Sequence, residues 1–226
     1  MCGRYSFAPK PKQRKTLENI VEVPAELELR FNIAPTQSAY VIANDLPTRL
    51  EQMEWGLVPQ WSADGKNLGK LINARTEGIA EKPSFRDPIQ HKRCLVPADS
   101  FYEWRKLSGV RKTPYRIFLE NEDLLFLAGI WDEWKQAGKI KRTFSIITTT
   151  PNREMSDLHD RMPVLLPDAE AQRLWLYPLP LNEVLSLLHP PKDGLLSRYR
   201  VSEKLNKAGI EGPDLQMQVP EELSLF

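Results

Sequence analysis

Residues 124–131, Leu-Leu-Phe-Leu-Ala-Gly-Ile-Trp, and residues 143–149, Thr-Phe-Ser-Ile-Ile-Thr-Thr, decide the predicted fold. Both runs are short and rich in β-branched, aromatic and aliphatic residues, as is typical of buried strands. Five further runs share this pattern: Ser38 to Ala43, Arg49 to Trp55, Lys92 to Val96, Phe101 to Arg105 and Tyr115 to Leu119. Seven strands with few helices predict one β-rich α+β domain with a curved, barrel-like sheet.

The predicted helices are peripheral to this sheet. Residues 16–23 are one candidate. Asp168 is expected to cap the amino end of a helix over residues 169–177, because its carboxylate can accept from the first backbone N–H groups. Asn182 is expected to cap another helix that runs to about His189.

The length of 226 residues suits a single domain with a substantial core. We assign residues 1–210 to this domain and residues 211–226 to a C-terminal tail. Its 41% hydrophobic and 27% charged residues are those of a soluble globular protein. No apolar run approaches the ~20 residues that span a membrane, and no signal peptide is recognisable. A cytoplasmic location without a membrane partner is therefore predicted.

The composition favours neither a metal site nor a cofactor. Only two cysteines occur, Cys2 and Cys94, so a disulfide framework is not expected. The three histidines lie far apart, and neither a CxxC or HExxH motif nor a glycine-rich phosphate loop is found. The net charge of +1 gives no global basic field that would announce a nucleic-acid partner.

Cys2 follows the initiator Met1, whose excision is expected because cysteine is small. The mature chain would then begin with an α-amine and a thiol on adjacent carbon atoms. An α-amine has a pKa of about 7.7–8.0, so part of it is unprotonated at neutral pH and can attack an aldehyde. The thiol can then close on the imine to give a five-membered thiazolidine. The competing interpretation is that Cys2 is only a small residue at the start of a buried strand.

Four segments place polar or aromatic groups in apolar surroundings: residues 55–61, 71–77, 101–104 and 158–163. Asn73 begins an alternation of polar groups, Glu103 lies between aromatic residues whose burial would raise its pKa, and His159 has a dense polar setting. Each segment also has a purely structural interpretation. The amide can bond a turn, the carboxylate can pair with Arg105, the histidine can cap a helix, and the aromatic loop can belong to the core or a lid.

Six short motifs occur in order along the chain: Cys2-Gly3-Arg4, Asn32-Ile33-Ala34-Pro35, Trp55-Gly56-Leu57-Val58-Pro59, Asn73-Ala74-Arg75-Thr76-Glu77, Phe101-Tyr102-Glu103-Trp104 and His159-Asp160-Arg161-Met162-Pro163. From about Cys2 to Asn206 the chain resembles the SRAP family, named for "SOS response-associated peptidase". Members of that family form covalent crosslinks with abasic sites in single-stranded DNA. The open form of such a site is an aldehyde, which is the electrophile that an adjacent amine and thiol can capture.

The resemblance implies roles for four residues. Cys2 would supply the amine and the thiol, and Asn73 would hold the amine and the sugar by hydrogen bonds. Glu103 would transfer protons during Schiff-base formation. His159 would protonate the ring oxygen of the sugar and assist reversal, which suits an imidazole with an ordinary pKa of about 6.5.

The resemblance also implies that single-stranded DNA is the partner. Arg4, Arg75 and Arg161 resemble the phosphate-binding arginines of the family, whose planar guanidinium groups match phosphate oxygens. Pro35 and Trp61 resemble the wedge that stacks on bases beside the lesion.

The chain ends Glu222-Leu223-Ser224-Leu225-Phe226, which resembles the peptide by which bacterial DNA enzymes bind the replication sliding clamp, usually Gln-Leu-Ser/Asp-Leu-Phe. Leu223, Leu225 and Phe226 keep the apolar side chains, whereas Glu222 replaces the glutamine. A free tail can present such side chains to a groove. A tail folded onto its own domain and a chance match stay open. A clamp partner would place a bacterial protein near the nucleoid.

Two other functions compete with crosslinking. A thiol (auto)peptidase would use Cys2 as nucleophile, with His159 and Glu103 as base and orienting group. A noncovalent single-strand-binding module would keep all DNA association without Cys2 and would depend strongly on salt. Crosslinking is itself enzymatic only in a qualified sense, because the forward reaction consumes the protein and turnover requires reversal.

Overall fold

The structure, a computed structural model, describes residues 2–66, 69–106, 112–136 and 138–221. Along the chain the elements are β1 (Tyr5–Phe7), α1 (Pro11–Glu18), β2 (Arg30–Ile33), β3 (Ser38–Ala43), β4 (Glu51–Trp55), β5 (Asn73–Arg75), α2 (Arg86–His91), β6 (Arg93–Ala98), β7 (Ser100–Lys106), β8 (Lys112–Leu119), β9 (Leu125–Gln136), β10 (Lys139–Thr149), β11 (Met162–Pro163), α3 (Ala169–Leu176), α4 (Leu181–Ser186) and β12 (Leu196–Arg200), followed by the short 3₁₀ turns Glu203–Asn206 and Pro213–Gln216.

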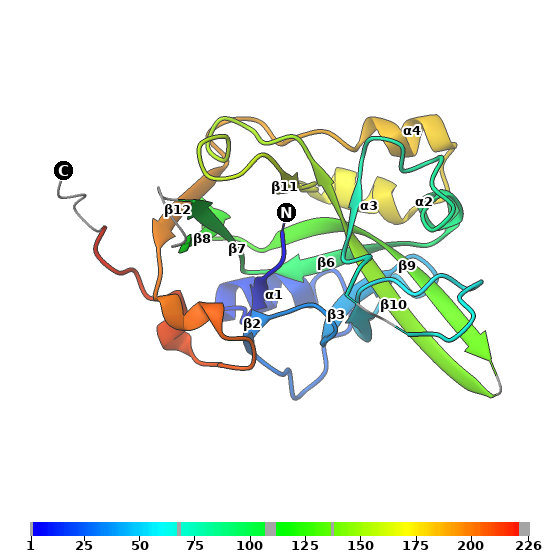
Figure 1. The fold of residues 1–226 in the computed structure, drawn as a ribbon, viewed down its shortest axis with the longest axis horizontal. Helices are drawn as coiled ribbons and strands as arrows, with labels where there is room; N and C mark the ends of the chain where they lie inside the picture. Colours follow the sequence, from blue (N-terminus) through cyan, green and yellow to red (C-terminus); the bar gives the residue numbers. More distant parts are fainter. Residues whose placement is uncertain (1, 67–68, 107–111, 137, 222–226) are drawn as a thin grey trace.

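Five strands close into a barrel. β10 pairs with β4, β4 with β3, β3 with β6, β6 with β9, and β9 returns to β10. Among these five pairings only that of β4 with β10 is parallel. The long β9–β10 hairpin projects from one side of the molecule (Figure 1). Closure leaves these strands without free edges, which is a common solution for small β domains. The predicted barrel-like sheet is confirmed.

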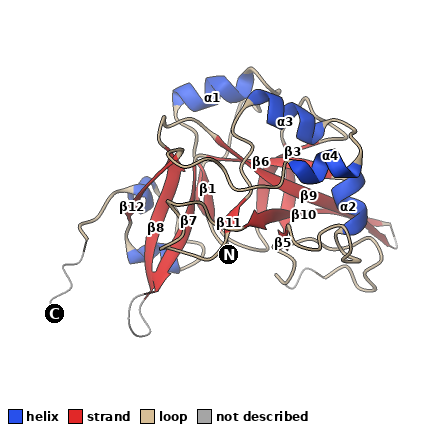
Figure 2. Ribbon diagram, turned by 90° about the horizontal axis from the view of Figure 1, so that it is seen from above, coloured by secondary structure: helices blue, strands red, loops and turns tan. Residues whose placement is uncertain are grey.

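A second sheet lies beside the barrel, with the strand order β12-β8-β7-β1-β2. Only Asp99 separates β6 in the barrel from β7 in the second sheet, so the chain changes sheets there. The helices α1 to α4 lie along one side of the two sheets, whereas β5 and β11 lie toward the other (Figure 2). The helices are short, and α1 and α3 have eight residues each. Within the described ranges no helix is long and apolar enough to cross a membrane.

β4 and β5 lie end to end along the same edge of β10, and both run parallel to it. β4 ends with Trp55 opposite Phe144, and β5 begins with Asn73 opposite Ile146. The loop of residues 56–72 leaves the sheet between these two points. The backbone N–H of Gly56 donates to the Phe144 carbonyl at 2.8 Å, so the start of the loop is fixed on β10.

An aromatic core joins the barrel to the amino end of the chain. The rings of Tyr5 and Trp55 meet edge to face with centroids 5.2 Å apart, and Trp55 stacks on Phe144 at 6.4 Å. Trp55 Nε1 also donates to the carbonyl of Ile72 at 2.9 Å. Because Tyr5 lies three residues after Cys2 and Ile72 precedes Asn73, this cluster fixes both segments relative to β10.

Arg93 joins the carboxyl ends of two helices in the interior. Its side chain, in a residue only 1% exposed, donates to the carbonyls of Ile89 and Gln90 at the end of α2, at 3.0 and 2.6 Å. It also donates to the carbonyls of Trp175 and Tyr177 at the end of α3, at 2.7 and 2.6 Å. These terminal carbonyls lack partners within their helices, and their partial negative charge favours a cation.

The predicted helices are confirmed in place but not always in extent. Asp168 caps α3 by accepting from the Ala171 N–H at 2.8 Å. The prediction for residues 16–23 is wrong in its bounds, because α1 begins at Pro11, a favourable first residue, and ends at Glu18. α4 likewise starts at residue 181 rather than after a cap at Asn182.

The described part of the C-terminal segment contacts the domain. Gln216 donates to Asp99 Oδ2 at 2.7 Å, and Tyr115 donates its hydroxyl proton to Glu221 at 2.8 Å. The boundary at residue 210 stays a prediction, since contacts continue to Glu221. The predicted clamp-binding residues Leu223, Leu225 and Phe226 lie outside the described residues.

Candidate active site

The four predicted catalytic residues come from four separate parts of the fold. Cys2 precedes β1, Asn73 begins β5, Glu103 lies on β7, and His159 lies in the connection between β10 and β11. β1 runs antiparallel to β7, with the N–H of Tyr102 donating to the carbonyl of the residue two after Cys2, at 2.9 Å. The sheet pairing therefore brings the start of the chain alongside Glu103.

Asn73 holds the backbone of Cys2. Its side-chain Nδ2 donates to the Cys2 carbonyl oxygen at 2.9 Å. Cys2 is fully buried, and its thiol lies 4.0 Å from the Arg4 carbonyl. Burial raises the pKa of the Cys2 thiol, and the nearby negative charge of Glu103 raises it further. Burial at this position therefore favours the neutral thiol over the thiolate.

Glu103 is a buried carboxyl group with a pKa near neutrality. Its residue is 2% exposed, and burial raises its pKa to about 7. Oε2 lies 4.0 Å from Nε2 of His159, about one ångström longer than a hydrogen bond. A carboxyl group that is half protonated near pH 7 can act as either acid or base, as the sequence predicts for this position.

His159 is placed to hold a proton on either ring nitrogen. Nδ1 accepts from the backbone N–H of Arg161 at 3.0 Å, which in the neutral ring leaves the proton on Nε2, toward Glu103. The exposed carboxylate of Asp160 is also 2.8 Å from Nδ1 and can accept when this nitrogen is protonated. Neutral and charged rings both have partners, which suits a residue that transfers protons.

Comparison with known proteins identifies the family. The model described as "SOS response associated peptidase (SRAP)" matches residues 1–208. The chain belongs to the SRAP family. Abasic site processing protein YoqW of Bacillus subtilis (strain 168) is 41% identical over 221 residues, covering 95% of this chain and 98% of that protein. Abasic site processing protein HMCES of Gallus gallus is 32% identical over 204 residues, covering 77% and 60%.

Solved structures show the same SRAP architecture. The crystal structure of a protein from Bacteroides thetaiotaomicron superposes with a TM-score of 0.85 at 30% identity, and the match covers 97% of this chain and 100% of that one. A protein from Bordetella bronchiseptica gives a TM-score of 0.73 at 25% identity, covering 89% and 100%. The barrel and its companion sheet are thus a fold shared with these proteins.

The predicted phosphate-binding arginines of this SRAP chain differ in exposure. Arg75 is exposed and lies on the same face of β5 as Asn73, two residues earlier. Arg4 is half-buried and donates to Asn32 Oδ1 at 2.6 Å and to the Leu205 carbonyl at 2.8 Å. Its guanidinium lies 5.9 Å from the ring centroid of Trp104. Asn32 and Trp104 occur in the sequence motifs, but their support of Arg4 was not predicted.

Arg161 is bound within the SRAP domain. It is 8% exposed and donates to Glu77 Oε1 at 2.7 Å and to the carbonyl of Thr148. The hydrogen bond from Arg161 is the main cause that lowers the pKa of Glu77 to about 2. Glu77 lies two residues beyond the end of β5, so the extended segment that begins at Asn73 ends before it. A phosphate contact by Arg161 stays a prediction.

The two predicted wedge residues lie on loops that the barrel holds in place. Trp61 is 63% exposed, and the loop around it is fixed where the N–H of Gln60 donates to Asp132 at 2.8 Å. Gly65 of the same loop has φ +62°, and a Cβ there would lie 2.6 Å from the Trp134 ring, so only glycine fits. Pro35 is half-buried in the turn after β2. The base contact of both residues stays a prediction.

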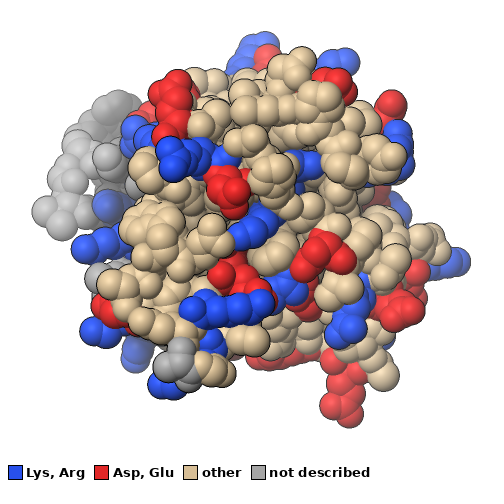
Figure 3. All heavy atoms as spheres, turned by 90° about the vertical axis from the view of Figure 1, so that its right-hand side faces the viewer, with Lys and Arg blue, Asp and Glu red and all other residues tan. Residues whose placement is uncertain are grey.

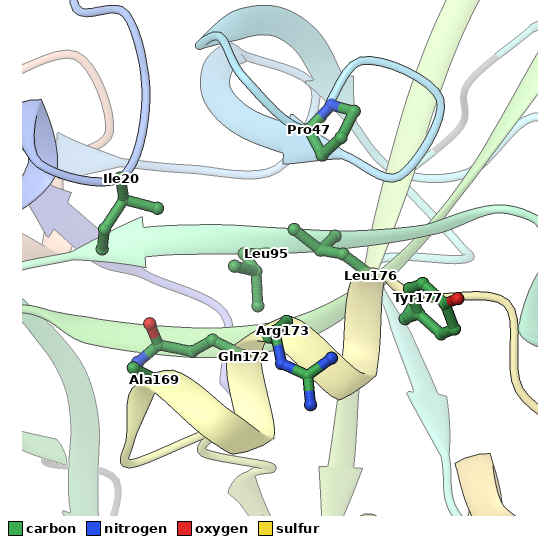
Figure 4. A pocket seen from close by; sticks show the side chains of 8 residues that line it. All are labelled: Ile20, Pro47, Leu95, Ala169, Gln172, Arg173, Leu176 and Tyr177. Carbon is green, nitrogen blue, oxygen red and sulfur yellow. The ribbon is translucent and has the colours of Figure 1, made fainter.

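An apolar cavity of about 300 Å³ lies apart from this site, between α3, β6 and the loops at Ile20 and Pro47 (Figure 4). Its lining includes none of the predicted site residues.

Charges on the face at the β9–β10 end alternate in sign, so no broad basic field covers that side (Figure 3). An anionic polymer that binds this face would therefore depend on individual basic side chains and not on a broad field.

Proposed function

We propose that this SRAP protein captures abasic sites in single-stranded DNA as a thiazolidine formed by Cys2 after removal of Met1. The observation that carries the proposal is the placement of Cys2, whose carbonyl is held by Asn73 beside Glu103 and His159. Relatives at 41% and 32% identity named abasic site processing proteins support the choice of substrate.

The chemistry balances without an oxidant or a metal. The α-amine of Cys2 attacks the aldehyde carbon, and the carbinolamine loses one water to give an imine. The thiol sulfur then bonds to the imine carbon, while the thiol proton is transferred to nitrogen. Glu103, with a pKa of about 7, can take the proton of the attacking amine and return it to the leaving hydroxyl. His159 would donate the proton that opens the sugar ring.

The state of the thiol favours this sequence over a peptidase. A nucleophilic cysteine needs a thiolate, and reactive cysteines have lowered pKa values. Here burial and Glu103 raise the pKa of Cys2 instead. A neutral thiol is a poor first nucleophile, but it can supply both the sulfur and the proton that ring closure onto an imine requires.

Partner contacts follow from the same site. We infer that Arg75, exposed beside Asn73, binds a phosphate next to the lesion, with Arg4 and Arg161 as further ligands and Pro35 and Trp61 against the bases. The covalent complex would shield the abasic site, and it would be released slowly. Reversal assisted by His159 would make the protein a slow enzyme that works where single-stranded DNA is exposed, in the cytoplasm at the nucleoid.

Loss of Cys2 is expected to abolish the covalent product. The untagged protein, shown by intact mass to lack Met1, is mixed with a single-stranded oligonucleotide that carries one abasic site and is run on a denaturing gel. A heat-resistant shifted band is expected for the native protein and not for Cys2→Ala. Cys94→Ala is the matched control, since Cys94 is equally buried, in β6, and should keep the band.

Three other results would contradict the proposal. Absence of the band from protein that lacks Met1 would exclude capture by Cys2. A band that persists in Cys2→Ala would move the covalent chemistry to another residue. Peptide hydrolysis that survives selective blocking of the α-amine, in protein that never crosslinks, would support the thiol peptidase.

We also propose that the end of the chain binds a bacterial sliding clamp. The carbonyl of Pro220 accepts from Arg200 at 2.9 Å and Glu221 from Tyr115, so the clamp-like residues follow a fixed point on the domain surface. A fluorescent peptide of the last ten residues is expected to bind a clamp, and the peptide with both Leu225 and Phe226 replaced by Ala is not. No binding of the native peptide at about 100 μM would refute the proposal.

A further inference from the structure

Two side-chain contacts connect β7 to the segment that carries His159. The first joins Glu103 and His159, whose Oε2 and Nε2 atoms are 4.0 Å apart. The second joins Arg105 Nη2 and Asp157 Oδ2 at 2.9 Å. Arg105 lies two residues after Glu103, on the same face of the strand, and Asp157 lies two residues before His159. The two contacts therefore lie side by side between the same two segments.

Asp157 is held from a second strand as well. Arg198 of β12 donates to both carboxylate oxygens, at 2.7 and 2.9 Å. The hydrogen bond from Arg198 is the main cause that lowers the pKa of Asp157, so the carboxylate is charged throughout the neutral range. A two-point contact between arginine and carboxylate fixes orientation as well as distance. Arg105 is itself oriented by Tyr115, with its guanidinium 4.8 Å from the ring centroid.

The segment of residues 150–161 depends on such contacts because it contains neither helix nor strand. Its internal backbone bonds are local turns, such as those from the N–H groups of Leu158 and His159 to the Met155 carbonyl. Met155 and Leu158 are buried and fix the depth of the segment. Apolar contacts do not fix orientation, whereas directional bonds do. Arg153 and Glu154 bond to residues 193, 194 and 198 at the start of the segment, and the bonds to Asp157 lie nearest to His159 on its amino side.

We propose that Asp157 is a positioning residue that, through Arg105 and Arg198, sets the imidazole of His159 beside Glu103 for proton transfer. The inference rests on the proposed function, because it concerns release of the thiazolidine. The bonds that fix Asp157 are made with Arg105 and Arg198, so in this proposal it acts through the placement of His159. Misplacement of a catalytic group by about one ångström can cost as much as a hundredfold in rate.

The test measures the release of a preformed crosslink, by transfer of abasic DNA to excess competitor oligonucleotide. Four proteins are compared: the native chain, Asp157→Asn, His159→Ala and the double variant. Asp157→Asn is expected to slow release about tenfold. In the His159→Ala background the same change is expected to alter release less than about twofold, because residues that act through one another are not additive. A merely structural change would slow release equally in both backgrounds.

A second variant and a control distinguish slower release caused by the lost contact from slower release caused by misfolding. Arg105→Gln breaks the same contact from β7 and is expected to reproduce the effect of Asp157→Asn. Glu122→Gln removes an exposed ion pair of 2.8 Å with Lys10 and should leave release unchanged. Melting curves identify any variant that fails to fold.

The outcomes separate the inference from the proposed function. Native protein that forms no crosslink overturns both. Native protein that crosslinks, with release unchanged in Asp157→Asn and in Arg105→Gln, overturns the positioning role alone. Equal slowing by Asp157→Asn in both backgrounds also overturns it, because the effect would then not pass through His159.

Discussion

Replacing Glu103 by glutamine is expected to stabilise the protein at pH 8 and to slow crosslink formation by a factor of about 10²–10⁴. The loss of rate follows from removing the acid and base at the imine-forming step. The gain in stability follows from burial, which raises the pKa of this carboxyl from 4.5 to about 7 because its charged form is poorly solvated. Glutamine has a similar shape and never ionises.

The sign of the pH dependence follows from proton binding. Between pH 4.5 and 7 the folded protein holds the Glu103 proton more tightly than the unfolded chain does. The free energy of unfolding contributed by this group therefore falls as pH rises through that window, by roughly 3 kcal/mol in total. Glu103→Gln lacks this loss. The free energy of unfolding of this variant should exceed that of the native protein by almost nothing at pH 4 and by the full amount above pH 7.

Thermal and urea unfolding at pH 4, 6 and 8 measure this difference. Glu26→Gln, at an exposed position, is the control and should track the native protein at each pH. A Glu103→Gln protein that is less stable than the native one at pH 8 would contradict the prediction. It would show that contacts of the ionised carboxylate outweigh its loss of solvation.

Replacing Arg93 by methionine is expected to destabilise the fold by about 3–5 kcal/mol. The change would leave the carbonyls of Ile89, Gln90, Trp175 and Tyr177 without the donor that now serves all four. Each unsatisfied buried acceptor costs about 1–3 kcal/mol, and part of this is recovered where water can enter. The ends of α2 and α3 would lose their common partner.

Denaturant unfolding of Arg93→Met and Arg93→Lys measures this effect. Lysine keeps the charge but cannot reach four carbonyls in a planar arrangement, so an intermediate loss is expected. Crosslinking well below the melting temperature should be retained in both, since Arg93 bonds to the ends of α2 and α3 and to none of the four candidate catalytic residues. A loss of less than about 1 kcal/mol in Arg93→Met would mean that the carbonyls find other partners.

Periodicity predicted the strands that are long and have strong turn signals. All seven predicted strands occur, as β3, β4 and β6 to β10, with ends displaced by a few residues. β1, β2, β5, β11 and β12 were not predicted. Three of them, β1, β5 and β11, have only two or three residues, too few to show a period. β1, Tyr5–Phe7, is buried at every position, so it lacks the alternation that marks a half-exposed strand.

The candidate site residues were chosen from motifs and not from any local pattern. That Cys2, Asn73, Glu103 and His159 belong together came from resemblance, because no local pattern brings residues so far apart in the chain to one place. The raised pKa of Glu103 was expected from its aromatic neighbours in the sequence, but it depends on burial by several elements of the fold. The bonding of Arg161 to Glu77 could not be predicted, since an arginine near His159 in the sequence suits a phosphate equally well.

The end-to-end arrangement of β4 and β5 along β10 has a consequence for the loop that joins them. Trp55 pairs with Phe144 and Asn73 with Ile146, so both ends of the 56–72 loop are fixed on one strand. Each doubling of loop length costs only about 0.6 kcal/mol in closure entropy. We therefore expect insertions in the loop after Gln60 to leave Asn73 in place and, under the proposed function, to change which nucleic-acid structures fit beside the lesion. The loop can thus vary in length and sequence while its two ends stay on β10.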